Sequence, residues 1–321
     1  MRLFASSLLL LAGCSSAVMA AEAQYPSRPI RFIVGFTPGG ASDTVARVVS
    51  QKLAERLNQQ IVIDNRGGAG GNIATEIAAR SAPDGYTLLL GTPGPLTITP
   101  NLGKPMAFDP ERDFRPVSLV ASTMAVLMVH PQVATSVREL IAVAKAKPGQ
   151  LNYASSGQGT SNHLAAELFN TMAGTRIVHV PYKGAGQNLP ALISGEVQLT
   201  FGPIVPALPM IRSGKLRALG VTGTKRSQAA PEIPTIAEAG VPGYRIDSWY
   251  GTLLPAGSPA AIASRLNREI VAVVAMPEVS ERLAREGADP MTSSSDEFAQ
   301  HIRNERIKWK KLMTVIKPAA S

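Results

Sequence analysis

A strand–loop–helix segment near the start of the chain constrains the fold more than any other feature. Residues 30–34 predict a short buried strand, and apolar residues recur at helical spacing after the loop that follows, at Val45, Val49, Leu53 and Leu57. Ser42 is a residue type that caps helices, and Gly39-Gly40 lets the backbone approach whatever lies above the strand end. Free N–H groups and the dipole at a helix start favour an anion such as a carboxylate. The alternative is an ordinary Pro-Gly-Gly turn.

A second segment repeats this arrangement more than a hundred residues later. Residues 151–154 predict a strand, and the hydroxyl-rich loop 155–161 leads into a helix. The predicted inner face of that helix carries Leu164, Leu168, Phe169 and Met172. Ligands of open α/β sheets bind beyond the carboxyl ends of the strands. The two loops therefore predict two α/β units that offer backbone donors to one ligand between them.

Composition excludes several functional classes. The chain has 321 residues, 45% hydrophobic and 17% charged, which is typical of a globular protein of two domains. Its formal charge of +9 is scattered and aromatic residues make up 5%, which argues against a nucleic-acid binder but favours small anions. Four histidines without metal-ligand spacing argue against a metal site. There is no nucleophile-elbow motif, and the single cysteine, Cys14, lies in the leader.

The first twenty residues predict an export signal. Arg2 precedes an apolar stretch over residues 3–13, and Val18-Met19-Ala20 is an acceptable cleavage site, so we expect a periplasmic protein cleaved near Ala20. An alternative is that Leu11-Ala12-Gly13-Cys14 acts as a lipobox and the protein is lipid-anchored at Cys14. No later apolar run is long enough to span a bilayer.

The first unit alternates strands and helices. Strands are predicted at residues 30–34, 61–63 and 86–90, with helices from residue 42 and over residues 72–80, which implies a parallel sheet. The glycine-rich loop 65–71 matches neither the dinucleotide fingerprint nor a P-loop. We interpret it as a tight, mobile turn. Residues 93–116, with five prolines, predict an irregular excursion.

A second alternation follows. Residues 117–129 predict one long strand, and residues 249–255 predict an extended segment. Between these two segments we expect a helix at 137–146 and strands at 151–154, 177–180, 197–201 and 216–221. Three helices finish the chain, near 259–275, 277–286 and 295–316, and with no further strand predicted we expect them to cover the first unit. The chain would then cross between units at about 120–130 and 245–255. Two crossings make a hinge.

Several motifs in consistent order resemble the Bug family, the extracytoplasmic solute receptors of tripartite tricarboxylate transporters. The resemblance runs from about residue 25 to 315 and is specific only as a set. Its motifs are Tyr25-Pro26-Ser27-Arg28-Pro29-Ile30, Pro38-Gly39-Gly40 with Asp43 and Ala46-Arg47, Pro83-Asp84-Gly85-Tyr86-Thr87, Tyr153 through His163, Val180-Pro181-Tyr182-Lys183-Gly184, Gly214-Lys215-Leu216-Arg217-Ala218-Leu219, Pro234-Thr235 with Glu238-Ala239-Gly240, and Trp249-Tyr250-Gly251.

The resemblance implies a type II periplasmic-binding-protein fold of class α/β, with two lobes joined by a two-segment hinge. Residues 1–20 would be the signal peptide, 21–125 and 250–321 the first lobe, and 126–249 the second. The function implied is a non-catalytic receptor that captures a small organic carboxylate and delivers it to membrane permease subunits. We expect a monomer without a cofactor.

The resemblance also implies which residues bind the ligand. The two loops would hold one carboxylate, partly through waters, and Gly91-Thr92 would line the same cleft. The expected binding residues are Phe36, Thr37, Pro38, Gly39, Gly40, Ser42, Asp43, Gly91, Thr92, Ser155, Ser156, Gly157, Gly159, Thr160, Ser161, His163, Tyr182, Lys183 and Gly202. Many members carry an acidic residue where this chain has Gly202. Its loss favours a plain mono- or dicarboxylate over an amino acid.

Several of these residues have a structural alternative. His163 could donate to the ligand or fix its loop, and we favour the loop. Asp43 would repel an anion, so we expect it to stabilise the helix start or tie the loop. For Tyr182 and Lys183 we favour loop ordering, and for Trp249 and Tyr250 hinge packing over cleft lining.

Two rival functions remain open. One is an exported hydrolase or lyase that uses Lys183, His163 or a serine of the second loop in the same cleft. The other is a ligand-sensing receptor that acts through a signalling partner. Missing catalytic pairings argue against the enzyme, while the sequence does not separate transport from signalling.

Overall fold

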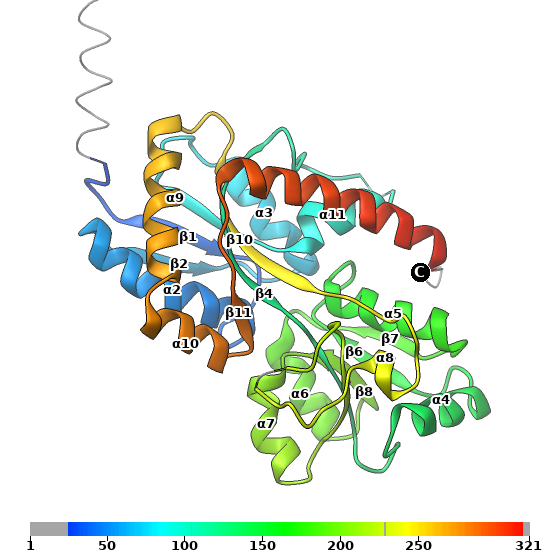
Figure 1. Ribbon diagram of the computed structural model, residues 1–321. Helices are drawn as coiled ribbons and strands as arrows, with labels where there is room; N and C mark the ends of the chain where they lie inside the picture. The colour runs from blue at the N-terminus through cyan, green and yellow to red at the C-terminus, as the bar shows by residue number, and fades with distance from the viewer. Residues whose placement is uncertain (1–24, 104, 228, 317–321) are drawn as a thin grey trace, which may run out of the picture.

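The computed structural model describes residues 25–103, 105–227 and 229–316. The predicted cleavage near Ala20 and the alternative anchor at Cys14 lie outside the described residues. Two lobes, each built on one β-sheet with helices on both faces, make up an elongated molecule (Figure 1). None of the helices in the described part of the chain is long and apolar enough to cross a membrane.

The sheet of the first lobe has the order β11-β4-β10-β3-β1-β2. The parallel β2-β1-β3 core matches the predicted alternation, and β10 runs antiparallel between β3 and β4. The elements of this lobe are β1 (Ile30–Val34), α2 (Ala41–Leu57), β2 (Ile61–Asn65), η1 (Ala69–Gly71), α3 (Asn72–Ala79), β3 (Thr87–Gly91), η2 (Gly94–Ile98), η3 (Thr99–Asn101), β4 (Phe114–Thr123), β10 (Ser248–Pro255), α9 (Ala260–Val274), α10 (Pro277–Arg285), β11 (Ala288–Pro290) and α11 (Ser295–Val315).

Alternating side chains of these strands build two cores, one on each face of the sheet. Phe32 and Leu88 face the layer of α2, α9 and α10, whereas Ile33 and Leu89 face α3 and α11. β1 and β3 are each buried on both faces, which is why their sequences are nearly continuous apolar runs. Packing on both faces holds the carboxyl ends of β1 and β3, and the loops after them, at one edge of the lobe.

The sheet of the second lobe has the order β7-β6-β8-β5-β9, in which β5 is antiparallel to both neighbours. Tyr153 and Phe201 pack toward α4, α5 and α8, and Met128 and Ala154 toward α6 and α7. The elements are β5 (Val126–Val129), α4 (Val137–Ala146), β6 (Asn152–Ser155), α5 (Ser161–Ala173), β7 (Val178–Pro181), α6 (Ala185–Ile193), β8 (Leu199–Gly202), α7 (Ile204–Arg212), β9 (Arg217–Val221) and α8 (Ile236–Ala239).

Two extended segments connect the lobes. The first passes from β4 through Met124 and Ala125 into β5, and the second enters β10 at Ser248. They lie side by side, because Ser248 pairs with Thr123 in the first sheet and Thr222 bonds to the backbone of both Ala125 and Ile246.

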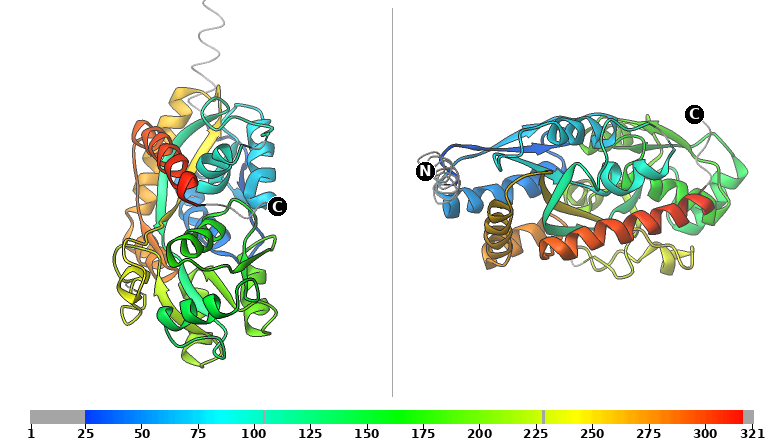
Figure 2. Two further views of the ribbon diagram at one scale, coloured as in Figure 1. Left: turned by 90° about the vertical axis from the view of Figure 1, so that its right-hand side faces the viewer. Right: turned by 90° about the horizontal axis from the view of Figure 1, so that it is seen from above.

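The last helix belongs to both lobes. Phe298 near its start packs in the core of the first lobe, whereas Trp309 and the following Ile316 belong to the core of the second. Figure 2 shows α11 running along one side of the molecule from the first lobe toward the second. The prediction that the last three helices cover the first unit is therefore right only for α9, α10 and the first half of α11.

Five further expectations about the elements are wrong. The run 117–129 is two strands in different sheets, since β4 ends at Thr123, and a short edge strand, β11, follows α10. Residues 93–116 include short helical turns, η2 and η3, that pack against α11. The side chain of Met172 is 38% exposed, on the outer face of α5. Gly40, not Ser42, is the N-cap of α2, and no side chain caps that helix.

Candidate functional site

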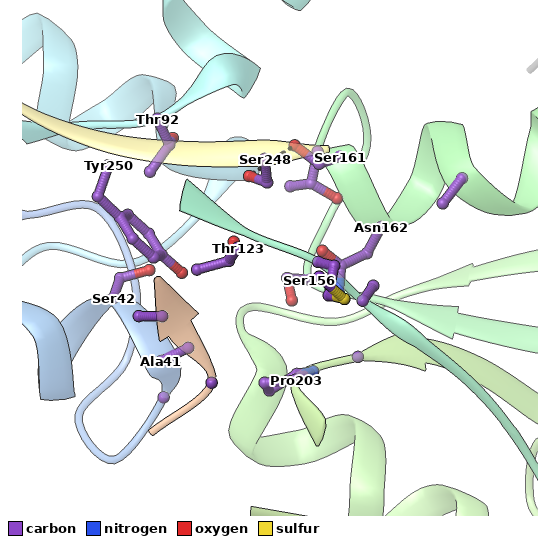
Figure 3. A pocket seen from close by; sticks show the side chains of 18 of the residues that line it. Ala41, Ser42, Thr92, Thr123, Ser156, Ser161, Asn162, Pro203, Ser248 and Tyr250 are labelled. Carbon is purple, nitrogen blue, oxygen red and sulfur yellow. Dashed lines mark hydrogen bonds between the residues drawn. The ribbon is translucent and has the colours of Figure 1, made fainter. Parts of the chain in front are cut away.

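A cavity of about 90 Å³ lies between the lobes, where the hinge strands and the loops after β1, β3, β6 and β8 converge (Figure 3). By the same measure one water needs about 10–15 Å³, so the cavity is sized for a small organic molecule. Its lining is Phe36, Gly40, Ala41, Ser42, Thr92, Gly94, Thr123, Met124, Ala125, Ser156, Thr160, Ser161, Asn162, Ala165, Gly202, Pro203, Thr222, Ile246, Ser248, Tyr250, Glu286, Gly287 and Ala288.

The start of α2 forms one wall of the cavity. The first helical bond runs from the N–H of Thr44 to Gly40, so the preceding amides of Ala41 and Ser42 have no intrahelical carbonyl. Asp43 ties the loop from behind: its Oδ2 accepts from the Gly39 N–H at 3.0 Å and from the Arg47 Nε at 2.9 Å. Burial opposes ionisation of Asp43, but these bonds, with one from Asn65, outweigh it and hold the pKa of Asp43 below its usual value.

The start of α5 forms the facing wall. Thr160 is the N-cap, and its Oγ1 accepts from the N–H of His163 while donating to the Gly157 carbonyl at 2.8 Å. Ser161 reaches the hinge through a 3.3 Å hydroxyl contact with Ser248. In Figure 3 Ser156, Ser161 and Asn162 gather at this end of the cavity.

A third helix start, that of α7, lies at the same cavity through Gly202 and the N-cap Pro203. Among the described residues that line the cavity none is a lysine, arginine or histidine, and Glu286 is the one charged residue. The positive potential at the site therefore comes from three helix N-termini and neutral donors.

The hinge strands supply the remaining wall. Tyr250 projects its ring toward Ser42 and Thr123, and burial raises the pKa of its phenol although the two hydroxyls bond to it (Figure 3). Trp249, one residue earlier on the strand, points to the opposite side and packs on Phe298. Hinge packing is thus right for Trp249, while Tyr250 lines the cavity.

The predicted binding residues divide into two layers. Those that line the cavity are Phe36, Gly40, Ser42, Thr92, Ser156, Thr160, Ser161 and Gly202. The others, Thr37, Pro38, Gly39, Asp43, Gly91, Ser155, Gly157, Gly159, His163, Tyr182 and Lys183, lie outside the lining. Tyr182 donates to Glu196 at 2.6 Å and Lys183 is exposed.

A buried ring cluster supports the loop before α5. The Nδ1 of His163 accepts from the Gly159 N–H at 3.2 Å, and Ser155 Oγ lies 2.6 Å from the Nε2 of His179. Burial lowers the pKa of His163 to about 3, helped by the neighbouring His179, and burial lowers the pKa of His179 to about 4. Ser155 is fully buried, and neither it nor the half-buried His179 is part of the cavity lining.

The sequence reasoning missed residues of two kinds. Those on the hinge strands, Thr123, Ser248 and Tyr250, could have been found, because residues two apart on a strand share a face. Glu286 and Gly287, between α10 and β11, gave no signal, because their place depends on how a distant edge strand pairs.

A second hollow, of about 260 Å³, lies on the other side of the hinge strands near Trp249 and His301. Its main charges are paired: Lys308 with Glu305 at 2.9 Å, and Arg245 with Asp247 at 3.0 Å. Unlike the first cavity, it is reached by none of the loops that follow the parallel strands.

Comparison with known proteins identifies the family. Residues 45–317 match the family described as the tripartite tricarboxylate transporter family receptor, TctC. This chain belongs to that family. Protein BugT of Bordetella pertussis is 37% identical over 310 residues, which cover 96% of this chain and 95% of BugT.

Two solved structures of the family align over nearly their whole length. Rpa4515 of R. palustris with adipate is 38% identical, with a TM-score of 0.88 over 91% of this chain and 98% of that one. MatC of Rhodopseudomonas palustris with bound malate is 31% identical, with a TM-score of 0.85 over 91% and 100%. The predicted Bug family and its two-lobed periplasmic-binding-protein fold are confirmed.

Proposed function

We propose that this protein is an extracytoplasmic receptor that captures a small organic carboxylate in the cavity between its lobes. The observation that carries the proposal is the lining: three helix starts and a set of neutral donors converge there, and none of the described lining residues is a lysine, arginine or histidine. A carboxylate replaces its water shell with such donors at little reorganisation cost, because the amides are already oriented.

The ligand class follows from the same lining and from the relatives. Adipate and malate, each with two carboxylates, are the ligands named for two related structures. Gly202 offers no side chain to a cationic amino group. We therefore infer a mono- or dicarboxylate without an amino group. Glu286 disfavours a carboxylate beside it, so the ligand anion would lie toward the starts of α2 and α5.

A thermal-shift screen tests this function. The protein is unfolded, stripped of carried-over ligand and refolded, then screened with adipate, malate, succinate and citrate at millimolar concentration beside aspartate and glutamate. A ligand that binds only the native state raises its melting temperature, and at equal concentration a tighter ligand raises it more. We expect at least one plain carboxylate to stabilise the protein more than either amino acid. Stabilisation by none of the carboxylates would refute the proposal.

We infer that the protein acts in the periplasm and passes its ligand to permease subunits of a tripartite tricarboxylate transporter, as its family membership supports. Mature protein beginning at Ala21 in the periplasmic fraction is the expected result. Labelling by a fatty acid, lost in Cys14→Ser, would instead establish the anchored form.

An enzymatic role is disfavoured by the buried position of Ser155, which pairs with His179 outside the cavity lining. Turnover of a bound carboxylate that disappears in His163→Ala or Lys183→Ala, while binding persists, would establish the rival enzyme. We expect no turnover, and binding retained in Lys183→Ala because Lys183 lies outside the lining.

We also propose the bodies that move. Residues 25–125 with 250–316 would form one, and 126–249 the other, because the two sheets are separate. The end of α11, with Trp309 and Ile316, packs in the core of the second body and would link the two.

A further inference from the structure

The glycine-rich loop after β2 does not line the cavity, and it is in contact with the opposite lobe. A methyl group placed on Gly70 would lie 2.5 Å from the carbonyl oxygen of Gln158, and one placed on Gly157 would lie 3.1 Å from the backbone nitrogen of Gly70. The backbones of the two lobes therefore lie against each other here, too close for a side chain at Gly70 or Gly157.

A second close contact between the lobes, here of backbone with a side chain, lies next to the first. A methyl group on Gly184 would lie 2.4 Å from Thr37 Oγ1 and 3.4 Å from the Thr37 backbone nitrogen. A methyl group on Gly67 would meet both lobes, at 3.3 Å from the Thr37 backbone nitrogen and 3.5 Å from the Lys183 carbonyl oxygen. The φ of Gly184 is 173°, which any residue adopts, so only the missing space requires glycine at this position.

The two lobes also touch at the opposite rim of the cavity. A methyl group on Gly287 would lie 3.2 Å from the side chains of both Ile204 and Val205, at the start of α7. The cavity thus lies between two places where the lobes touch. At Gly70 the opposing group is a backbone carbonyl, which cannot rotate away as the end of a side chain can, whereas at Gly184 the nearest atom is the hydroxyl of Thr37.

We propose that Gly70 and Gly184 are positioning residues that set how far the two lobes can close. The inference rests on the proposed function, because it assumes that closure secures the ligand. A side chain at either position would hold the lobes apart, lengthen the hydrogen bonds that the facing helix starts make to the ligand, and lower affinity without touching the ligand. The interpretation of the loop as a simple mobile turn omitted this contact.

The test uses Gly70→Ala and Gly184→Ala, each with a matched control. Gly70 has a φ of +64°, so its control is Gly149→Ala, at +79° with no atom within 4 Å of the added methyl; Gly186→Ala, equally open, is the control for Gly184. Calorimetry with adipate and with malate measures affinity. We expect a loss of at least tenfold for the two test variants and less than twofold for the controls.

Small-angle scattering, with and without each ligand, gives a readout that does not need binding. The two test variants should keep a larger radius of gyration than wild type at saturating ligand, with the melting temperature of each ligand-free variant equal to that of its control. If both variants had the affinity and the radius of gyration of wild type, this inference would be overturned, while the proposed function would stand. If wild type binds no carboxylate, the proposed function fails, and the radii of the ligand-free variants still decide whether these glycines set the separation of the lobes.

Discussion

At the scale of single residues, the site is made by backbone conformation more than by reactive side chains. Gly39 has a φ of +80° and its amide is held by Asp43, whereas Gly40 has a φ of −85° and lines the cavity. The sequence reasoning treated the two glycines alike. Only Gly39 needs glycine for its conformation; Gly40 matters for the space above the start of α2.

Gly40→Val tests that distinction. A Cβ atom fits at Gly40, since it would lie 3.6 Å from the Thr37 carbonyl oxygen, and we expect the larger branched side chain to take up space in the cavity that Gly40 lines. We expect carboxylate affinity to fall at least tenfold, about 1.4 kcal/mol, in a protein that remains folded by circular dichroism. Gly40→Ala is the control and should lose much less. Unchanged affinity in a folded Gly40→Val protein would place the ligand elsewhere.

At the scale of elements, most strands and helices followed from the sequence. β1 and α4 match their predicted bounds, because each carries an uninterrupted pattern bounded by turn or capping residues. The run 117–129 was misjudged because both of its strands are buried and apolar throughout, and periodicity does not show where one sheet ends and the next begins. Of the site, the loops after β1 and β6 were predictable from local pattern. Glu286 and Gly287 were not, since the tertiary pairing of β11 with β4 places them.

The neighbouring rings of His163 on α5 and His179 on β7 predict a pH dependence of stability. His163 and His179 remain neutral in the fold because burial lowers the pKa of each, to about 3 and about 4, whereas an unfolded histidine takes up its proton near pH 6.5. Stability should therefore fall as pH drops from about 6.5 toward 4, by at most about 1.4 kcal/mol per pH unit for each histidine.

Urea unfolding at pH 7, 6 and 5 measures this slope. His163→Gln should have a shallower decline than wild type, and the double variant with His179→Gln a shallower one still. The same slope in all three proteins would mean that the two rings are protonated in the native state.

At the scale of the whole molecule, the last helix links the two cores. Trp309 is fully buried in the second lobe, although α11 begins on the first, and its indole nitrogen has no hydrogen-bond partner among the described residues. The hydrophobic area of this ring, rather than a polar bond, should therefore hold the helix in place.

We expect Trp309→Ala to lower the free energy of unfolding by about 3–5 kcal/mol. Trp309→Phe should cost far less, because the indole nitrogen that it removes makes no bond. The control is Ile307→Ala on the same helix, whose side chain is 56% exposed. Chemical denaturation measures all three. A Trp309→Ala protein as stable as the Ile307→Ala control would show that α11 does not anchor the second lobe.

The central claim is that neutral donors at converging helix starts bind a carboxylate without a cationic side chain. Calorimetric titration of refolded, ligand-free protein with adipate and with its neutral diamide tests it most directly, because the two molecules differ little in length and shape. The account predicts binding of adipate with one site per chain, at least tenfold tighter than the diamide, and sharply weakened in Gly40→Val. Equal affinity for the two molecules, or undiminished adipate binding in Gly40→Val, would contradict it.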